Sequence, residues 1–376
     1  MSAATDQQAT DDRPIFEVDD LAVSFANGKG PRLQAVDGVR MSIYPRQTLA
    51  VVGESGCGKS VTAMSSLQLI PRPPGRFDRG RIEFVRESGD AIDLLSLDDR
   101  AMRDVRGNDI AMIFQEPMSS LNPVFTVGDQ IIEAILLHQR VPKSKAVDIA
   151  VDAMRAVGIP EPERRLKAYP HQFSGGMRQR VMIAMALACQ PRLLLADEPT
   201  TALDVTIQAQ ILDLLGDLKR DRGMAVMLIT HDLGVVAQHA DVVCVMYAGR
   251  VVEYAPVFEL YARPLHPYTR GLLASIPKIS AHAGDRVDRL TTVAETVNAS
   301  GAFDALPGVD ADLKPWWPWH DRPEGVESAA PGDDYTLHLV DAETQHWVGL
   351  WRTPGIGPSP APRCSFRVAE AGVPSA

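Results

Sequence analysis

The 376-residue chain has few cysteines and no long apolar run, and each shortage excludes a class of protein. Its four cysteines, at positions 57, 189, 244 and 364, show no C-x-x-C spacing, which indicates free thiols in a reduced, cytosolic environment. The apolar stretch over residues 181–196 is broken by Gln190, Pro191 and Arg192. Because a membrane-spanning helix needs about 20 apolar residues in a row, we do not expect the chain to cross a membrane.

A basic excess is missing as well. With 48 acidic and 38 basic residues the formal net charge is −10, so nucleic acid is not expected as the main partner. The first residues are polar and acidic and lack the basic and apolar segments of a secretory signal, and we expect residues 1–14 to form a disordered tail. The length allows two domains or one large and one smaller domain, and 45% hydrophobic residues match a globular protein with a sizeable core.

The strongest local pattern is Gly53-Glu54-Ser55-Gly56-Cys57-Gly58-Lys59-Ser60, which fits G-x-x-x-x-G-K-[ST] and follows a predicted buried strand over 48–52. A glycine-rich turn between a strand and a helix surrounds phosphates with backbone N–H groups. We expect Lys59 to reach the β- and γ-phosphates and Ser60 to bind Mg²⁺, and we include Val61 in the nucleotide site. A glycine-rich surface turn that fits by chance is the alternative, and the strand before it makes this the weaker interpretation.

The hydrophobic pattern predicts an α/β fold with an inserted helical part. Residues 15–25 and 35–43 indicate antiparallel strands at a sheet edge. Helical patterns cover about 116–188, and Ser144 is a predicted N-cap there. Alternation of short apolar runs with helical segments predicts parallel strands over 193–196, 226–229 and 242–246. We place one domain over 15–255 and a small, irregular C-terminal domain over 256–376, in which 335–340 and 346–351 form one small hairpin or sheet.

Polar residues at the ends of predicted strands indicate nucleotide hydrolysis. Asp197 and Glu198 end the apolar run 193–196, whose strand we expect beside that of the phosphate loop. Asp197 would then lie near Mg²⁺, and Glu198 near the γ-phosphate, where it would orient and deprotonate water. His231 and Gln115 follow two other strands and would reach the same edge, Gln115 bonding to the metal or the attacking water. Solvated acids and a structural histidine are the alternatives.

Ser174, Gly175 and Gly176 open a second helix with two glycines and so offer a second phosphate-binding helix N-terminus. One subunit has no need of two such sites for one γ-phosphate. We therefore expect nucleotide to lie between two subunits arranged head to tail. A simple capped helix start is the alternative.

In this order the motifs resemble those of the ATP-binding subunits of ABC transporters. The resemblance covers about 15–255 and implies a P-loop (RecA-like) ATPase core with an antiparallel β edge subdomain, an inserted helical subdomain, and ATP and Mg²⁺ as cofactors. It implies that Phe25, otherwise a core aromatic, stacks on adenine. The remaining matches are 53–60 to Walker A, Gln115 to the Q-loop, 174–176 to the signature, 193–198 to Walker B, Ala202-Leu203-Asp204 to the D-loop and His231 to the switch histidine.

Three segments resemble the dipeptide/oligopeptide (peptide/nickel) uptake branch of that family. Met177 stands where the general family usually has glutamine, and Arg178-Gln179-Arg180 follows it. The others are Glu116-Pro117-Met118-Ser119-Ser120-Leu121-Asn122-Pro123 and Pro264-Leu265-His266-Pro267-Tyr268-Thr269-Arg270. Both are otherwise ordinary proline-containing loops and helix stops.

What this branch implies is import of dipeptides or oligopeptides, energised from the cytoplasmic side of the inner (cytoplasmic) membrane by a peripheral ATPase. The implied partners are two integral-membrane permeases, a second ATP-binding subunit, identical or homologous, and an extracytoplasmic solute-binding protein. Nickel, glutathione and sugar oligomers stay open as solutes. A soluble ABC-type ATPase of DNA repair or translation usually has a long coiled-coil insert or tandem ATPase domains, and this sequence has neither pattern. A P-loop phosphotransferase would leave 174–176 without a task.

The C-terminal tail departs from the family pattern. Many peptide-uptake ATPases carry a cysteine-rich segment there that resembles an iron–sulfur ligand set, whereas this tail offers Cys364 alone and has Leu350 where a cysteine is common. Because a [4Fe–4S] cluster uses four thiolates, we expect a metal-free tail. We expect its tryptophans to form a small apolar core instead, an exposed patch for a partner being the alternative. They are Trp316, Trp317, Trp319, Trp347 and Trp351.

Overall fold

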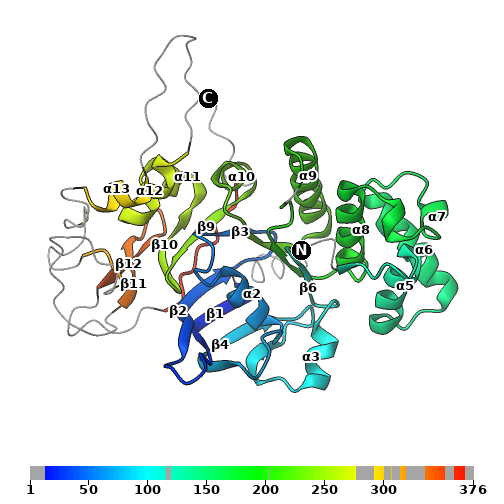
Figure 1. The fold of residues 1–376 in the computed structure, drawn as a ribbon, viewed down its shortest axis with the longest axis horizontal. Helices are drawn as coiled ribbons and strands as arrows, with labels where there is room; N and C mark the ends of the chain where they lie inside the picture. The colour runs from blue at the N-terminus through cyan, green and yellow to red at the C-terminus, as the bar shows by residue number, and fades with distance from the viewer. Residues whose placement is uncertain are drawn as a thin grey trace, which may run out of the picture.

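The computed structural model describes residues 13–115, 120–201, 203–276, 292–299, 306, 314–318, 335–351 and 360–368. Ala202, Trp319, residues 116–119 and most of the predicted N-terminal tail lie outside these ranges. Two β-sheets and the helices around them form the described part, and the predicted α/β fold class is confirmed (Figure 1).

The smaller sheet is antiparallel and has the strand order β2-β1-β4-β5. It contains the two antiparallel strands predicted near the N-terminus, of which β2 lies at the edge of the sheet and β1 lies next to it. Its strands are β1 (Phe16–Phe25), β2 (Leu33–Ile43), β4 (Gly75–Val85) and β5 (Ala91–Asp93).

The larger sheet has eight strands in the order β11-β12-β10-β9-β3-β8-β7-β6. The five strands from β9 to β6 are parallel, and the other three are antiparallel to their neighbours. Its strands are β3 (Thr48–Val52), β6 (Ile110–Ile113), β7 (Leu193–Asp197), β8 (Ala225–Ile229), β9 (Val242–Tyr247), β10 (Arg250–Pro256), β11 (Tyr335–Asp341) and β12 (His346–Trp351). The phosphate loop follows β3, whose neighbours in the sheet are β9 and β8. The prediction that β7 lies directly beside β3 is therefore wrong.

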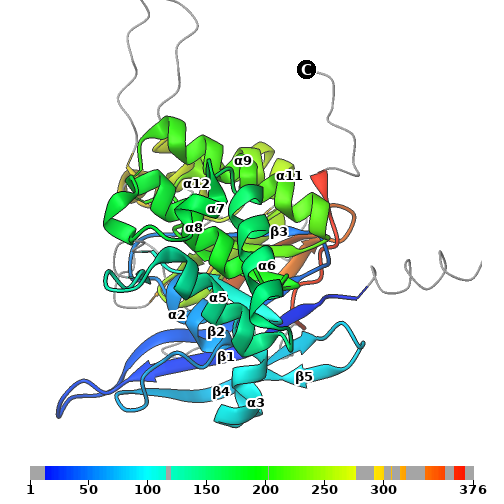
Figure 2. The ribbon, with the colours of Figure 1, turned by 90° about the vertical axis from the view of Figure 1, so that its right-hand side faces the viewer.

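Helices cover the larger sheet, and a group of helices lies beyond one end of it. In Figure 1 helices α5 to α8 lie at one end of the molecule, and α12, α13 and the β11–β12 hairpin lie at the other. Turned by 90°, Figure 2 shows the four-stranded sheet on one side, helices α9, α11 and α12 on the opposite side, and β3 between them. The helices are α2 (Lys59–Ser66), α3 (Asp99–Val105), α5 (Val127–His138), α6 (Lys143–Ala156), α7 (Pro162–Arg165), α8 (Gly175–Leu187), α9 (Val205–Arg222), α10 (Leu233–His239), α11 (Val257–Ala262), α12 (Pro267–Ala274) and α13 (Val293–Val297), with 3-10 turns η1 (Leu94–Ser96) and η2 (Pro170–Gln172).

One helix start differs from its prediction. Helix α6 begins at Lys143 with Pro142 as its N-cap, so Ser144 lies inside the first turn and does not cap it. Proline at this position fixes the backbone at an extended entry (φ −66°, ψ 153°) and ends the preceding loop without a side-chain cap. Across the described ranges, none of the helices has the length and apolar character that a membrane crossing requires.

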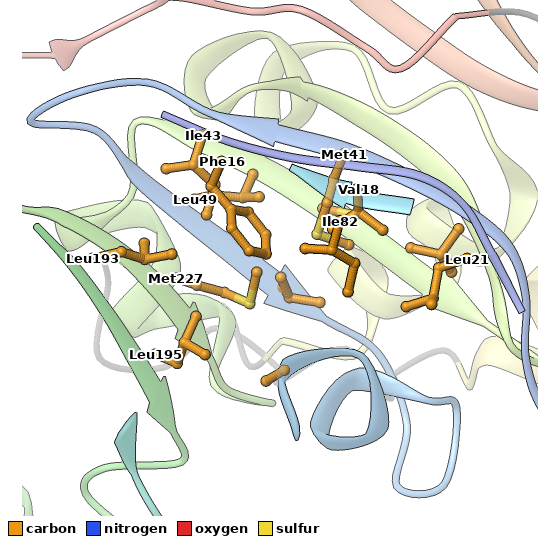
Figure 3. Close-up of a cluster of buried hydrophobic side chains, with 14 of the residues drawn as sticks. Phe16, Val18, Leu21, Met41, Ile43, Leu49, Ile82, Leu193, Leu195 and Met227 are labelled. Atoms are coloured by element: carbon orange, nitrogen blue, oxygen red, sulfur yellow. The ribbon is translucent and has the colours of Figure 1, made fainter. Parts of the chain in front are cut away.

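A single apolar core joins the two sheets (Figure 3). Phe16 of the smaller sheet lies beside Leu49 and Met227 of the larger one, Val18 and Met41 belong to the same cluster, and all five side chains are fully buried. Burial of one such side chain stabilises the fold by about 1.5–3 kcal/mol, which makes this layer a main source of stability. The core fixes β3, and with it the loop that follows, against a second sheet.

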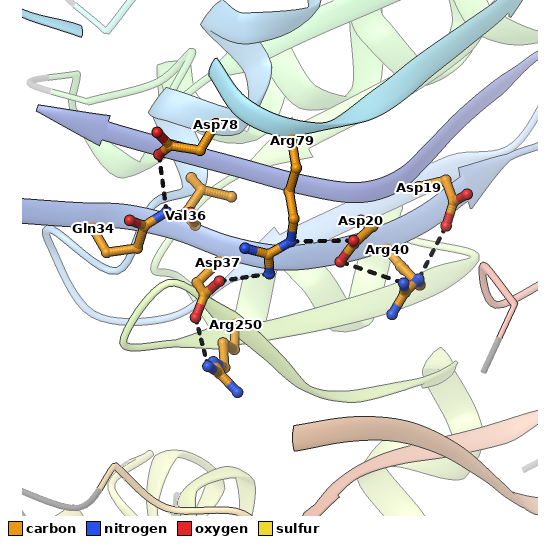
Figure 4. Close-up of polar contacts among 9 residues, drawn as sticks. All are labelled: Asp19, Asp20, Gln34, Val36, Asp37, Arg40, Asp78, Arg79 and Arg250. Carbon is orange, nitrogen blue, oxygen red and sulfur yellow. Dashed lines mark hydrogen bonds and ion pairs between the residues drawn. The ribbon is translucent and has the colours of Figure 1, made fainter. Parts of the chain in front are cut away.

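Ion pairs at one edge tie the same two sheets together (Figure 4). Asp37 of β2 accepts a hydrogen bond from Arg79 of β4 at 2.7 Å and another from Arg250 of β10. Burial raises the pKa of Asp37, but the two guanidinium groups outweigh it and hold the pKa below its usual value. Arg250 also lies 4.9 Å from the ring centre of Trp316 and 5.0 Å from that of Tyr335.

The described C-terminal tail extends the main sheet and does not form a unit beside it. Strand β12 pairs with β10, which would otherwise be an open sheet edge. Residues 360–368 return to the core, where the Gln47 side chain donates to the carbonyl oxygens of Cys364 at 2.8 Å and Phe366 at 2.9 Å. The Cys364 thiol is fully buried, and burial raises its pKa to about 11. A metal-free tail stays a prediction.

Among the tail tryptophans that the structure describes, three are buried against the main sheet and Trp351 is half-buried, whereas the sequence led us to expect a small core of their own. Trp316 and Trp317 pack in a cluster that includes Val52 and Val243. Trp347 belongs to the core between the two sheets. The pairing of β12 with β10 brings the rings onto an existing apolar face of the main sheet. Their burial there requires no separate core.

Candidate nucleotide site

The loop between β3 and α2 requires its glycines for steric reasons. At Gly53 the backbone has φ +147°, and an added Cβ would lie 2.1 Å from the carbonyl oxygen of Met246. At Gly58 φ is +104°, and an added Cβ would lie 2.6 Å from the carbonyl oxygen of Ala35. Side chains do not fit at either position. The close approach of β9 and β2 therefore explains two glycines of the sequence pattern.

Lys59 begins α2, and its side chain lies back over the loop. Its Nζ donates to the carbonyl oxygens of Gly53 at 2.7 Å and Glu54 at 2.8 Å, and it lies 3.7 Å from Cys57 Sγ. Glu54, Ser55 and Gly56 are exposed at the tip of the loop, whereas Lys59 is buried. The loop thus combines an exposed stretch of backbone with a fixed positive charge, which suits a bound anion.

Ser60 and Asp197 meet across the sheet. The Ser60 hydroxyl, in α2, donates to Asp197 Oδ1 at 3.0 Å, although β8 lies between β7 and β3, the strand that precedes the phosphate loop. Burial raises the pKa of Asp197, and the hydrogen bond from Ser60 offsets only part of that effect. A hydroxyl and a buried carboxylate fit the oxygen ligands that Mg²⁺ prefers, with phosphate and water completing its coordination. Within the described residues, no three or more His, Cys, Asp or Glu side chains form a metal-binding group.

Glu198 is surrounded by three hydrogen-bonding side chains from three parts of the chain. Its Oε2 accepts from Gln115 Nε2 at 2.8 Å and from the Thr201 hydroxyl at 2.9 Å, and its Oε1 lies 3.2 Å from His231 Nδ1. Burial raises the pKa of Glu198, but the hydrogen bonds from Thr201, His231 and Gln115 outweigh it and leave the pKa below its usual value. Glu198 is therefore an ionised acceptor at neutral pH, the protonation state that a general base needs.

The backbone at Glu198 turns in a way that separates it from Asp197. Glu198 has φ +46°, in the left-handed region that few non-glycine residues adopt, and its N–H donates to the carbonyl oxygen of Ile229 at 2.9 Å. Asp197 consequently reaches Ser60, whereas Glu198 reaches Gln115 and His231. Strained backbone of this kind costs of order 1–3 kcal/mol and is typical of functional sites.

The start of α8 lies apart from these groups. Ser174 caps the helix by accepting from the Met177 N–H at 3.3 Å, and Ser174 and Gly175 are exposed. An added Cβ at Gly176 would lie 2.9 Å from Ile207 of α9. In the part of the chain that the structure describes, no hydrogen bond joins residues 174–176 to the phosphate loop. The structure thus does not bring the two predicted phosphate-binding elements together within one chain.

Three further predicted ligand residues have structural contacts in the chain. Phe25 is half-buried at the end of β1 and packs against the core between the sheets, and Val61 does so from α2. Asp204 caps α9 by accepting from the Ile207 N–H at 2.9 Å. Their contacts with nucleotide stay predictions.

Sequence analysis missed two residues that touch this site. Thr201 lies three residues after Glu198 and contacts it. Only the position of Thr201 directly after the predicted catalytic strand end could have indicated this contact. Tyr268 of α12 accepts a hydrogen bond from the Glu54 N–H at 2.9 Å. Tyr268 lies inside the segment 264–270. The sequence identifies this segment by its family resemblance but does not indicate that it belongs to the nucleotide site.

The amino-acid sequence matches two family models. Residues 36–201 match the model described as ABC transporter, and residues 252–302 match the model described as oligopeptide/dipeptide transporter, C-terminal region. The oligopeptide transport ATP-binding protein OppD of Bacillus subtilis (strain 168) is 54% identical over 299 residues, which cover 80% of this chain and 77% of that protein. The dipeptide transport ATP-binding protein DppD of the same organism is 52% identical over 271 residues, 72% of this chain and 79% of that protein.

Solved structures show the same likeness in three dimensions. A dimeric ATP-binding cassette in a post-hydrolysis state, bound to ADP and Pi, matches with a TM-score of 0.56 and 25% identity. The match covers 64% of this chain and 98% of that chain.

Proposed function

The chain belongs to the ATP-binding subunits of ABC transporters, and on that premise we propose that it powers the import of dipeptides or oligopeptides by hydrolysing ATP. The observation that carries the catalytic part is the meeting of four strand ends at one edge of the sheet. Ser60 contacts Asp197 at 3.0 Å, and Glu198 is held by Gln115 and His231. The names of the relatives, oligopeptide and dipeptide transport proteins, support the solute class.

Each group at this edge has a distinct task in the proposed reaction. The loop N–H groups and Lys59 bind the phosphates of ATP, and Ser60 and Asp197 hold Mg²⁺, which when bound neutralises phosphate charge. Glu198 accepts a proton from the attacking water, because it is ionised and lies at the same sheet edge as the phosphate loop. Gln115 and His231 orient the Glu198 carboxylate, and the exposed imidazole of His231 is available to the γ-phosphate.

A second ATP-binding subunit is proposed to complete the site. The exposed start of α8 carries free helix N–H groups that suit phosphate but lies away from this chain's own loop. Val205, beside Asp204, is 83% exposed, which supports a contact surface between subunits there. The dimeric state of the solved cassette bound to ADP and Pi supports the same arrangement. Residues 174–176 would then serve the nucleotide of the partner.

A groove between the helical part and the core is the proposed docking site for the permeases. Its volume is about 440 Å³, and its apolar lining includes Met112, Phe114, Met182 and Met185. Phe114 is 41% exposed and directly precedes Gln115, which donates a hydrogen bond to Glu198. An apolar segment bound in this groove would therefore contact the residue next to the Gln115–Glu198 hydrogen bond. Two integral-membrane permeases would each bring such a segment, which puts the chain on the cytoplasmic side of the membrane. A solute-binding protein outside would select the peptide.

Co-purification from detergent tests this proposal. The chain should be recovered with two integral-membrane permeases and a second ATP-binding subunit, and ATPase activity should accompany that complex. Phe114→Asp, on the groove surface, should release the permeases, whereas Phe258→Asp, with a similarly exposed side chain elsewhere, should not. Recovery with nucleic acid or ribosomes in place of permeases would contradict the proposal and support a soluble ATPase.

A further inference from the structure

We propose that the C-terminal extension positions the phosphate loop, and that Tyr268 is the positioning residue that does so. The hydroxyl of Tyr268, in the first turn of α12, accepts the hydrogen bond of the Glu54 N–H at 2.9 Å. The two residues are 214 positions apart in the sequence. The inference rests on the proposed nucleotide site but not on transport or on the nature of the solute.

The contact fixes one peptide group from both sides. The peptide between Gly53 and Glu54 donates its N–H to Tyr268, and its carbonyl oxygen accepts from Lys59 Nζ at 2.7 Å. This peptide opens the loop, directly after β3, at the residue with φ +147°. Its orientation sets the direction in which the following N–H groups point. Tyr268 therefore acts on the nucleotide through the loop and does not itself touch it.

A buried polar network holds Tyr268 in place. Glu253 of β10, with no exposed surface, accepts from the N–H groups of Leu265 at 2.7 Å and His266 at 3.0 Å. It also accepts from His346 Nε2 of β12 at 2.7 Å. A fully buried carboxylate is stable only when such donors satisfy it, so these three contacts fix where α12 begins. The β11–β12 hairpin is thereby connected to the position of Tyr268.

The His266 imidazole and two aromatic rings complete the support. Its Nδ1 accepts from the Tyr268 N–H at 3.2 Å, and its Nε2 donates to the carbonyl oxygen of Trp316 at 2.8 Å, which together require the neutral ring. Burial lowers the pKa of His266 to about 4, consistent with that state. The Tyr268 ring packs against Tyr247, with centroids 4.5 Å apart, and Tyr247 stacks on Trp317 at 4.6 Å. The phenol is thus held by contacts on its ring and its backbone.

Tyr268→Phe removes the hydroxyl and leaves the ring packing unchanged. Loss of one such hydrogen bond should weaken binding of a non-hydrolysable ATP analogue with Mg²⁺ to the full chain by about three- to tenfold. Turnover at saturating ATP should change less than twofold, because the Glu198 contacts are untouched. The split between affinity and turnover distinguishes loop positioning from a general loss of structure.

Tyr335→Phe is the matched control. Tyr335 is a half-buried tyrosine of the tail, and its hydroxyl donates to the Val251 carbonyl oxygen of β10, not to the loop. It should keep the analogue affinity within twofold of the wild type. Equal affinity of Tyr268→Phe and the wild type, with both chains folded, would overturn the inference.

Amide hydrogen exchange at the loop provides a second measurement, made first on the wild-type chain and then on Tyr268→Phe. The Glu54 N–H should exchange at least tenfold more slowly than the exposed N–H of Ser55 or Gly56, and Tyr268→Phe should abolish that protection. Exchange of Glu54 as fast as its neighbours would overturn the inference. A wild-type chain that binds no ATP analogue, but protects Glu54, would contradict the proposed function and leave the Tyr268 contact standing.

Discussion

Two glutamate–histidine pairs in the same sheet show how environment decides what a pair of residues does. Glu198 follows a parallel strand and lies 3.2 Å from His231, whose side chain is 68% exposed. Glu253 lies in the antiparallel half and contacts His346 at 2.7 Å, with both side chains fully buried. Glu198 borders solvent on a strained backbone, whereas Glu253 has its hydrogen bonds filled by protein donors.

The difference teaches that the two halves of the sheet divide the work. The parallel half ends in polar side chains, of which Gln115 and His231 are exposed and Glu198 is half-buried, and hydrolysis requires groups that water and ligand can reach. In the antiparallel half the polar groups are buried. This half supports α12, whose Tyr268 accepts a hydrogen bond from the phosphate loop. Substitutions in the first half should therefore change the rate, and substitutions in the second should change stability and nucleotide affinity.

Glu198→Gln should have the largest effect. Loss of a general base typically lowers the rate by about 10²–10⁴-fold, and the loop contacts of Lys59 are untouched, so ATP binding should persist. Steady-state ATPase and analogue binding in the assembled transporter measure the two quantities separately. Near-wild-type turnover would show that another group is the base.

Glu253→Gln makes the same chemical change in the buried half and should give the opposite result. The amide offers one acceptor oxygen to three donors, and an unsatisfied buried polar group costs about 1–3 kcal/mol in free energy of unfolding. Urea unfolding measures this loss, and turnover at saturating ATP should fall less than threefold. A large loss of turnover without a loss of stability would remove the distinction between the two pairs.

Acidification should act on the buried half through His266. Burial lowers its folded pKa from the ordinary 6.5 to about 4, opposed by Glu253 and the Trp316 carbonyl and assisted by Arg270. Between these pH values the unfolded chain binds the proton more readily, so stability is complete above about pH 6.5 and falls as the pH falls towards 4. The loss is at most about 1.4 kcal/mol per pH unit. Urea midpoints of the wild type should decrease more steeply over this range than those of His266→Asn, and equal slopes would contradict the expectation.

The sequence predicted the parallel half far better than the antiparallel half, and the reason is locality. The phosphate loop and the polar ends of β7, β8 and β6 are short stretches whose patterns identify them without knowledge of their neighbours. The position of β8 between β3 and β7, the pairing of β12 with β10 and the Tyr268–Glu54 contact depend on segments far apart in the chain. Such pairings are set by packing, which periodicity does not encode.

Smaller differences have local causes that sequence patterns also miss. The left-handed backbone at Glu198 occurs together with a hydrogen bond from its N–H to Ile229 on the adjacent strand. The sequence led us to expect Trp316 and Trp317 in an apolar core of the tail itself, but the surface that buries them includes residues of β3, β9 and α12. In each case the residue type indicated a special or buried position, but the sequence did not identify the residue's contact partner.

The central claim is that one chain carries only part of each ATPase site, and the concentration dependence of ATPase activity tests it most directly. Turnover per chain should be low for the isolated, dilute chain, because residues 174–176 must come from another subunit. It should rise steeply with chain concentration, or on addition of the permeases and a partner ATP-binding subunit. High turnover per chain that stays constant down to low nanomolar concentration would contradict the shared site.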